Sequence, residues 1–91
     1  MVMSKIPVYF MPGLAASPTI FENIKLPEDQ FEMHFLEWFL PTDKETIESY
    51  ALRMTEKIQD ENPVLVGVSF GGVLVQEMAK QMKVRKVIII S

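Results

Sequence analysis

The residue whose setting best suits it for chemistry is Ser69, in the stretch Gly67-Val68-Ser69-Phe70-Gly71. A serine hydroxyl is a weak nucleophile by itself. It becomes reactive when a tight turn exposes it beside a base and beside donors for a developing oxyanion. The pattern Gly-x-Ser-x-Gly is typical of such a turn, because glycine permits close approach of the backbone to itself. Ser69 is therefore a candidate nucleophile.

The residues on either side of Ser69 predict a strand followed by a helix. Asn62-Pro63 is a break, and residues 64–68 form a short, apolar, β-branched run, as expected of a buried strand. After Gly72 the apolar residues recur at spacings of three and four, as on one face of a helix. These residues are Leu74, Val75, Met78, Ala79 and Met82. A strand, a sharp turn and a helix N-terminus form the context that presents a serine nucleophile, although a glycine-rich turn with a bystander serine has the same pattern.

A second loop of interest is expected near the N-terminus. Residues 6–10 predict a strand, and the loop that follows contains Pro12-Gly13 and several small residues. Glycine and small residues let the backbone come close to a ligand. A short helix is expected over residues 18–24, because a serine precedes it and a proline begins it. Taken alone, this loop is equally well explained as an ordinary strand-to-helix connection.

Between these loops the chain carries another strand and a longer helix. Residues 31–38 alternate apolar and polar side chains, as a half-buried strand does, and Thr42 and Glu45 have the spacing of a capping box. The apolar residues of the following helix share one face: Ile47, Tyr50, Ala51, Met54 and Ile58. Residues 87–90 predict a buried strand. The alternating order predicts an α/β fold with a parallel four-stranded sheet, flanking helices and right-handed crossovers.

The whole chain resembles the N-terminal part of an α/β-hydrolase of the bacterial esterase and thioesterase type. The resemblance is carried by Tyr9-Phe10-Met11-Pro12-Gly13, by Phe35-Leu36-Glu37-Trp38 followed by Pro41, and by the stretch 67–72. It covers nearly all 91 residues, with the elements in the family's order. The resemblance implies a serine hydrolase that cleaves a small ester or thioester substrate through an acyl-enzyme.

The resemblance also implies roles for individual residues. Ser69 would be the nucleophile, and the backbone N–H groups of Phe70 and Leu14 would form the oxyanion hole. The residues expected to support the two turns are Gly67, Gly71, Gly72, Pro12 and Gly13. Many members of the family have His-Gly where this chain has Pro12-Gly13, a change that leaves donation by the backbone intact.

The family's strand order would bring the two loops together. In that order the second strand lies outside the first, and the third and fourth lie on the first strand's other side. The order therefore reverses between the first and third strands, and ligands of open parallel sheets bind at such a switch point, beyond the strand C-termini. Those two termini lead into residues 11–17 and 69–72.

The composition excludes several classes of function. The chain has no cysteine, hence no disulfide framework and no thiolate metal site. A net charge of −3 without a basic cluster argues against a nucleic-acid partner. No apolar run approaches the roughly 20 residues that span a bilayer, and the absence of a signal-peptide core predicts a cytoplasmic protein. We expect no metal and no other cofactor.

The partners that Ser69 would need are missing from the sequence after it. In this fold the nucleophile is followed by an Asp or Glu and then by a His. Only one acid, Glu77, and no histidine follow Phe70. Glu77 is expected to be a solvated helical residue, and the single histidine, His34, lies mid-strand and is expected to be structural. Trp38 and the seven methionines are expected to pack in the core or loops.

Residues 1–91 are therefore interpreted as one partial α/β-hydrolase domain, truncated after its fourth strand. Right-handed crossovers place the short helix on one face of the sheet and both longer helices on the other. One short helix cannot cover a face that parallel sheets keep buried, so we expect self-association through the uncovered sheet face or packing onto a partner chain. The alternative to an enzyme is thus a catalytically inactive module. An acyltransferase on the same fold is a further alternative.

Overall fold

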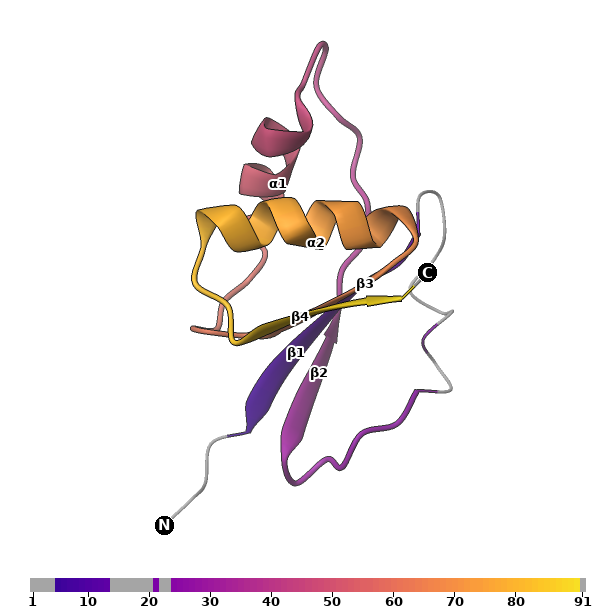
Figure 1. The fold of residues 1–91 in the computed structure, drawn as a ribbon, viewed down its shortest axis with the longest axis vertical. Helices are drawn as coiled ribbons and strands as arrows, with labels where there is room; N and C mark the ends of the chain where they lie inside the picture. Colours follow the sequence, from indigo (N-terminus) through magenta and orange to yellow (C-terminus); the bar gives the residue numbers. More distant parts are fainter. Residues whose placement is uncertain (1–4, 14–20, 22–23, 91) are drawn as a thin grey trace.

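The computed structural model describes residues 5–13, 21 and 24–90. Among these residues, four strands and two helices follow one another along the chain (Figure 1). The elements in order are β1 Ile6–Met11, β2 Phe31–Phe35, α1 Ile47–Thr55, β3 Val64–Val68, α2 Phe70–Gln81 and β4 Lys86–Ile90. The predicted α/β class is confirmed. The short helix expected over 18–24 lies mostly outside the described residues; the Ile24 N–H donates to the Phe21 carbonyl, 2.9 Å away.

The sheet has the order β2-β1-β3-β4, and every neighbouring pair of strands is parallel. The reversal of order therefore falls between β1 and β3, as predicted. Met11, the last residue of β1, pairs with Gly67, the last residue but one of β3. The two loops that follow these strands consequently leave the sheet side by side, at its C-terminal edge.

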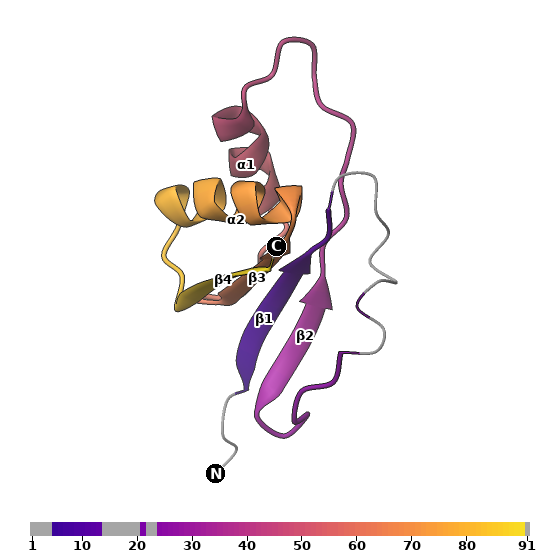
Figure 2. The same cartoon turned by 45° about the vertical axis from the view of Figure 1, so that its right-hand side comes forward.

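Both helices cover the same face of the sheet (Figures 1 and 2). The strand side chains on that face include Tyr9, Met11 and Leu65, which are buried in one cluster with residues of both helices. The predicted apolar face of α2 is confirmed at its centre, where Leu74, Val75 and Met78 have no exposed surface. Burial of this face is what anchors α2, and with it the turn that begins the helix.

The opposite face is buried at its centre and exposed at its margins. Val8, Phe10, Val64 and Val66 pack with Phe21 in a second cluster. On the outer strands of this face, Phe35, Ile88 and Ile90 are 41%, 39% and 42% exposed. The prediction of a buried strand over 87–90 is wrong in this respect, because β4 lies at the edge of the sheet, where one side has no neighbour among the described strands.

Several element boundaries differ from those predicted, including the end of α1, which stops at Thr55 before Ile58. The strand expected over 31–38 ends at Phe35, because its partner β1 ends at Met11 and leaves it no further ladder to extend. The helix begins at Ile47 and is capped by Thr46, whose hydroxyl accepts from the Ser49 N–H at 3.1 Å.

The expected capping pair forms a turn just before that helix instead. The Thr42 N–H donates to Glu45 Oε1, 2.9 Å away, and the Glu45 N–H donates to the Thr42 carbonyl at 3.2 Å. As for membranes, α2 is only 12 residues long, and within the described part of the chain no helix has the length and apolarity to cross a bilayer.

Candidate active site

Ser69 occupies a backbone conformation that few residues other than glycine adopt. Its φ is 56° and its ψ is −123°, and it stands between β3 and the first residue of α2. Conformations with positive φ cost a non-glycine residue of the order of 1–3 kcal/mol and persist only where the surroundings impose them. Here the Ser69 N–H donates to the Ile90 carbonyl at 2.8 Å, and the Gly72 N–H donates to the Ser69 carbonyl at 2.9 Å. The side chain is left exposed to solvent.

The glycines around Ser69 are there because a side chain would not fit. A Cβ on Gly67 would lie 2.6 Å from the Gly72 Cα and closer still to the Gly71 carbonyl. A Cβ on Gly71 would lie 2.5 Å from the carbonyl oxygens of both Met11 and Pro12. These are backbone atoms, which cannot move aside as a flexible side chain can. The turn after β3 is therefore pressed against the start of the loop after β1.

The loop after β1 reaches Ser69 itself. A Cβ on Gly13 would lie 3.5 Å from the Ser69 Cβ and 3.6 Å from the Val68 carbonyl, which is ordinary contact. Pro12 is fully buried beside it. The structure thus brings Pro12, Gly13 and Ser69 together at the edge where β1 and β3 end. Leu14, the expected second oxyanion donor, lies outside the described residues.

Phe70 is the first residue of α2, directly after Ser69. The first N–H groups of a helix lack intrahelical partners and carry the positive end of the helix dipole. The Phe70 N–H therefore belongs to the part of the turn that favours developing negative charge. Phe70 is 42% exposed, and its ring stacks on Trp38, with 5.8 Å between ring centroids and 22° between planes.

Trp38 touches both halves of the site, a role that the sequence reasoning missed. Its Nε1–H is shared between the carbonyl oxygens of Pro12 and Gly13, each 3.0 Å away. The ring contacts Phe70 on one side and Tyr50 of α1 on the other. A tryptophan removed from water must place its N–H on an acceptor, but nothing in the sequence names an acceptor 25 or 26 residues away.

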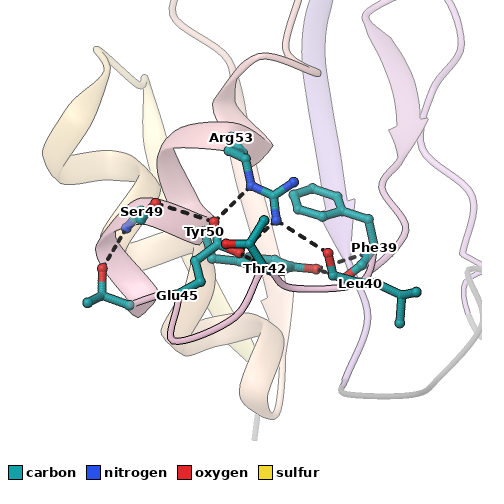
Figure 3. A network of polar contacts seen from close by, with 8 residues as sticks. Phe39, Leu40, Thr42, Glu45, Ser49, Tyr50 and Arg53 are labelled. Atoms are coloured by element: carbon teal, nitrogen blue, oxygen red, sulfur yellow. Dashed lines mark hydrogen bonds and ion pairs between the residues drawn. The ribbon is translucent and has the colours of Figure 1, made fainter.

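The segment that carries Trp38 is held by side chains of α1 (Figure 3). The Tyr50 hydroxyl donates to the Phe39 carbonyl at 2.6 Å and accepts from the Phe39 N–H at 2.8 Å. Arg53 forms two bonds to the Glu45 carboxylate, at 2.6 and 2.8 Å, and stacks over the Phe39 ring. The hydrogen bond from Arg53 lowers the pKa of Glu45 to about 2. The Glu45 side chain is only 2% exposed.

His34 lies in a separate polar cluster on β2. Its Nε2 is 2.7 Å from Glu32 Oε1 and 3.6 Å from Asp60 Oδ2, and its ring stacks on Tyr9 at 4.4 Å. The Tyr9 hydroxyl donates to the same Asp60 oxygen at 2.6 Å. Burial, followed by this bond to Asp60, raises the pKa of Tyr9. Donor atoms of Glu32, His34 and Asp60 lie within 4.8 Å of one another, a grouping that no sequence spacing indicated because Asp60 comes from a distant loop.

These three residues could hold a divalent cation, but the bonds already present satisfy them without one. A protonated His34 places one positive charge beside both carboxylates, and a neutral one can donate to Glu32. Their side chains are also 35–53% exposed, so water competes for every position. We therefore assign the cluster a structural role, in line with the expectation for His34.

Neither His34 nor Glu77 is placed to serve Ser69. His34 pairs with Tyr9, which pairs with Leu65, so all three lie at one level of the sheet. Ser69 is four residues beyond Leu65, about 13 Å along the strand direction, and β2 is two strands away from β3, about a further 10 Å across. A general base must lie within about 3 Å of the proton it takes. Glu77 forms an ion pair with Lys80 at 3.0 Å on α2.

A pocket of about 690 Å³ opens beside β2, away from Ser69. It is lined by Tyr9, Met33, His34, Phe35, Leu36, Glu37, Trp38, Phe39, Lys57 and Gln59. Ser69, Gly13 and Phe70 do not line it, and Trp38 is the residue that it shares with the serine site. The pocket is open because α1 and α2 cover little of β2. It is not the place where Ser69 would act.

The serine site has a strand-to-helix turn with positive φ at Ser69, a neighbouring loop that contains Gly13, and an indole that contacts both. It lacks a base among the described residues. No protein-family model, no curated protein sequence and no solved structure matches this chain.

Proposed function

We propose that this chain carries the nucleophile and the oxyanion-binding turns of a serine hydrolase of the α/β-hydrolase type. The observation that supports this most directly is the conformation of Ser69, with φ 56° and ψ −123° at the start of α2. Such strain is kept where it has a use, and here it exposes the hydroxyl beside a helix N-terminus. The confinement of Gly67 and Gly71 to glycine maintains that conformation.

In the proposed reaction Ser69 attacks the carbonyl carbon of an ester or thioester. The Oγ–C bond forms as the hydroxyl proton passes to a base, and collapse of the tetrahedral intermediate expels the alcohol or thiol, which takes that proton. Water then hydrolyses the acyl-enzyme. The Phe70 and Leu14 N–H groups would stabilise the oxyanion, and removal of one such donor costs about 2.7–4 kcal/mol in comparable enzymes.

The base in this proposal comes from outside the 91 residues. His34 is the single histidine of the chain, and it lies on β2 at a different level from Ser69. A complete hydrolase would add an acid and a histidine after β4, in the order that this fold uses. The 91 residues alone would then expose a serine without activating it.

A fluorophosphonate probe tests this proposal, since it reacts with activated serines and not with ordinary ones. In the protein as its native gene encodes it, we expect rapid stoichiometric labelling that Ser69→Ala abolishes. Ser49→Ala is the matched control, because Ser49 is an exposed serine of α1, and it should label normally. We expect residues 1–91 alone to label slowly at most.

The second candidate is an inactive module that associates through the sheet face opposite the helices. Exposure of Phe35, Ile88 and Ile90 on that face favours it. The same experiment separates the two candidates. A native protein that labels no faster than its Ser69→Ala variant would refute the hydrolase proposal and leave association as the function to examine.

A further inference from the structure

We propose that Trp38 is a positioning residue for the reaction at Ser69, whose indole holds the backbone of Pro12 and Gly13 against Ser69 and Phe70. This inference rests on the proposed function and deepens it. The observation that supports it is that one side chain, from the segment after β2, contacts both the loop after β1 and the turn after β3. Trp38 thereby adds a side-chain link to two loops whose backbones also pack on each other at Gly71.

Two backbone carbonyl groups accept from the indole of Trp38. The Nε1–H of Trp38 is the donor for both Pro12 and Gly13, at 3.0 Å each. A carbonyl oxygen that turned toward the carbon attacked by Ser69 would repel the developing negative charge, whereas an N–H there would stabilise it. Because a trans peptide holds its C=O and N–H in opposite directions, fixing these carbonyls on Trp38 fixes how the Pro12–Gly13 backbone faces Ser69.

The Gly13 backbone lies close to Ser69, because a Cβ built on Gly13 would be 3.5 Å from the Ser69 Cβ. The stack of Trp38 on Phe70 ties the same indole to the residue whose N–H begins α2. Trp38 therefore helps to fix the separation of the two backbone segments that would surround the oxyanion, in addition to the backbone packing at Gly71. A shift of about 1 Å in such groups can cost 100-fold in rate.

Trp38 is itself held in place by a side chain of α1. Its ring packs on Tyr50, and the Tyr50 hydroxyl bonds both backbone groups of Phe39, the next residue. The segment after β2 is thereby fixed to α1, which makes Trp38 a rigid support. A control must therefore lie elsewhere: Val8 of β1 is buried in the second cluster, on the opposite face of the sheet, so Val8→Ala lowers stability without touching this support.

The test is kinetic and uses the protein as its native gene encodes it, with a p-nitrophenyl ester as substrate and the active fraction titrated with fluorophosphonate. Trp38→Phe removes the indole N–H and keeps an aromatic ring. We expect kcat to fall about 10- to 100-fold, with KM within twofold. We also expect the affinity for a trifluoromethyl ketone, which forms a tetrahedral adduct, to fall by a similar factor. Affinity for the matching methyl ketone should be unchanged.

A second variant guards against misfolding of the first. Replacement of Trp38 by 3-benzothienylalanine keeps the shape of the indole and exchanges its N–H for sulfur, so the loss in kcat should recur with an unaltered unfolding midpoint. Val8→Ala should lower that midpoint by leaving a cavity in the second cluster and leave kcat per active site within twofold.

Three outcomes overturn the inference or its premise, and they are distinct. Retention of activity by Ser69→Ala refutes the proposed function itself. If Ser69→Ala is inactive but both Trp38 variants keep kcat within twofold, Trp38 does not position the site. An equal loss of kcat in Val8→Ala would mean that kcat follows general stability, which also refutes a specific role for the indole N–H.

Discussion

The turn after β3 and the segment after β2 flank the same site but are held in place by different physics. Around Ser69, backbone packs on backbone: Gly71 touches the carbonyls of Met11 and Pro12, and the Ser69 N–H bonds to Ile90. In the segment 36–46, side chains provide the fixation, through Trp38, Tyr50 and the Glu45–Arg53 pair. The first arrangement permits only certain residue types, whereas the second depends on partners brought together by the fold.

The two regions should therefore differ in how well they tolerate substitution. A Cβ added at Gly71 would lie 2.5 Å from backbone oxygens, so any added atom there must displace a strand or a helix. A side-chain bond can be lost while its neighbours hold the segment nearly in place. The turn should therefore fail abruptly on substitution, and the segment should weaken by degrees.

The largest effect is expected from Gly71→Ala. Its methyl group would lie 2.5 Å from two backbone oxygens of the loop after β1, and we expect a loss of about 3 kcal/mol or more in the free energy of unfolding. Urea denaturation followed by circular dichroism measures it. Gly13→Ala is the matched control, with its nearest contact at 3.5 Å, and should change stability by less than about 0.5 kcal/mol. Equal losses of stability in Gly71→Ala and Gly13→Ala would show that the turn is not especially intolerant of an added methyl group.

An intermediate effect of opposite sign is expected from Ser69→Gly. Glycine adopts positive φ without the steric cost that serine bears at φ 56°, and it gives back part of that gain through the greater freedom of the unfolded chain. We expect a net stabilisation of about 1 kcal/mol. Ser69→Ala, which keeps the Cβ, should stay within about 0.5 kcal/mol of the parent. If glycine destabilised the protein, the turn would not be strained at Ser69.

The smallest effect, and the one that depends on pH, is expected from Glu45→Gln. The pKa of Glu45 falls from 4.5 to about 2 through its bond with Arg53, so its ionised form stabilises the fold above pH 4.5 and this contribution is lost as the pH falls toward 2. The variant should be slightly less stable than the parent at pH 7, and the difference should vanish near pH 2. Arg53 is 37% exposed, so salt should reduce it too.

Thermal unfolding at several pH values measures that difference, with Glu61→Gln as a control from an exposed loop. A gap between parent and Glu45→Gln that persists unchanged at pH 2 would show that the packing of Glu45, rather than its charge, fixes the segment after β2.

Much of the fold could be predicted because it depends on local pattern. Strand β3 and helix α2 agree with the predictions from local pattern. The order of the sheet agrees with the one that the family resemblance implied. The errors arose where neighbours decide. The strand expected over 31–38 stops at Phe35 because β1 ends, and the run 87–90 is exposed because β4 has an edge. Apolar composition marks a residue as suited to burial, but it does not say what will cover that residue.

For the candidate site the division is similar. The residue pattern was enough to place Ser69 on a tight strand-to-helix turn, because glycines flank it and the apolar period changes there from strand to helix. Only the folded structure shows that Trp38 links Pro12 and Gly13 to Phe70, and that Asp60 lies beside His34. The two kinds of interaction differ in their separation along the sequence. Backbone sterics act between adjacent residues, whereas a side-chain hydrogen bond between residues 25 positions apart forms only after the sheet has brought the two residues together.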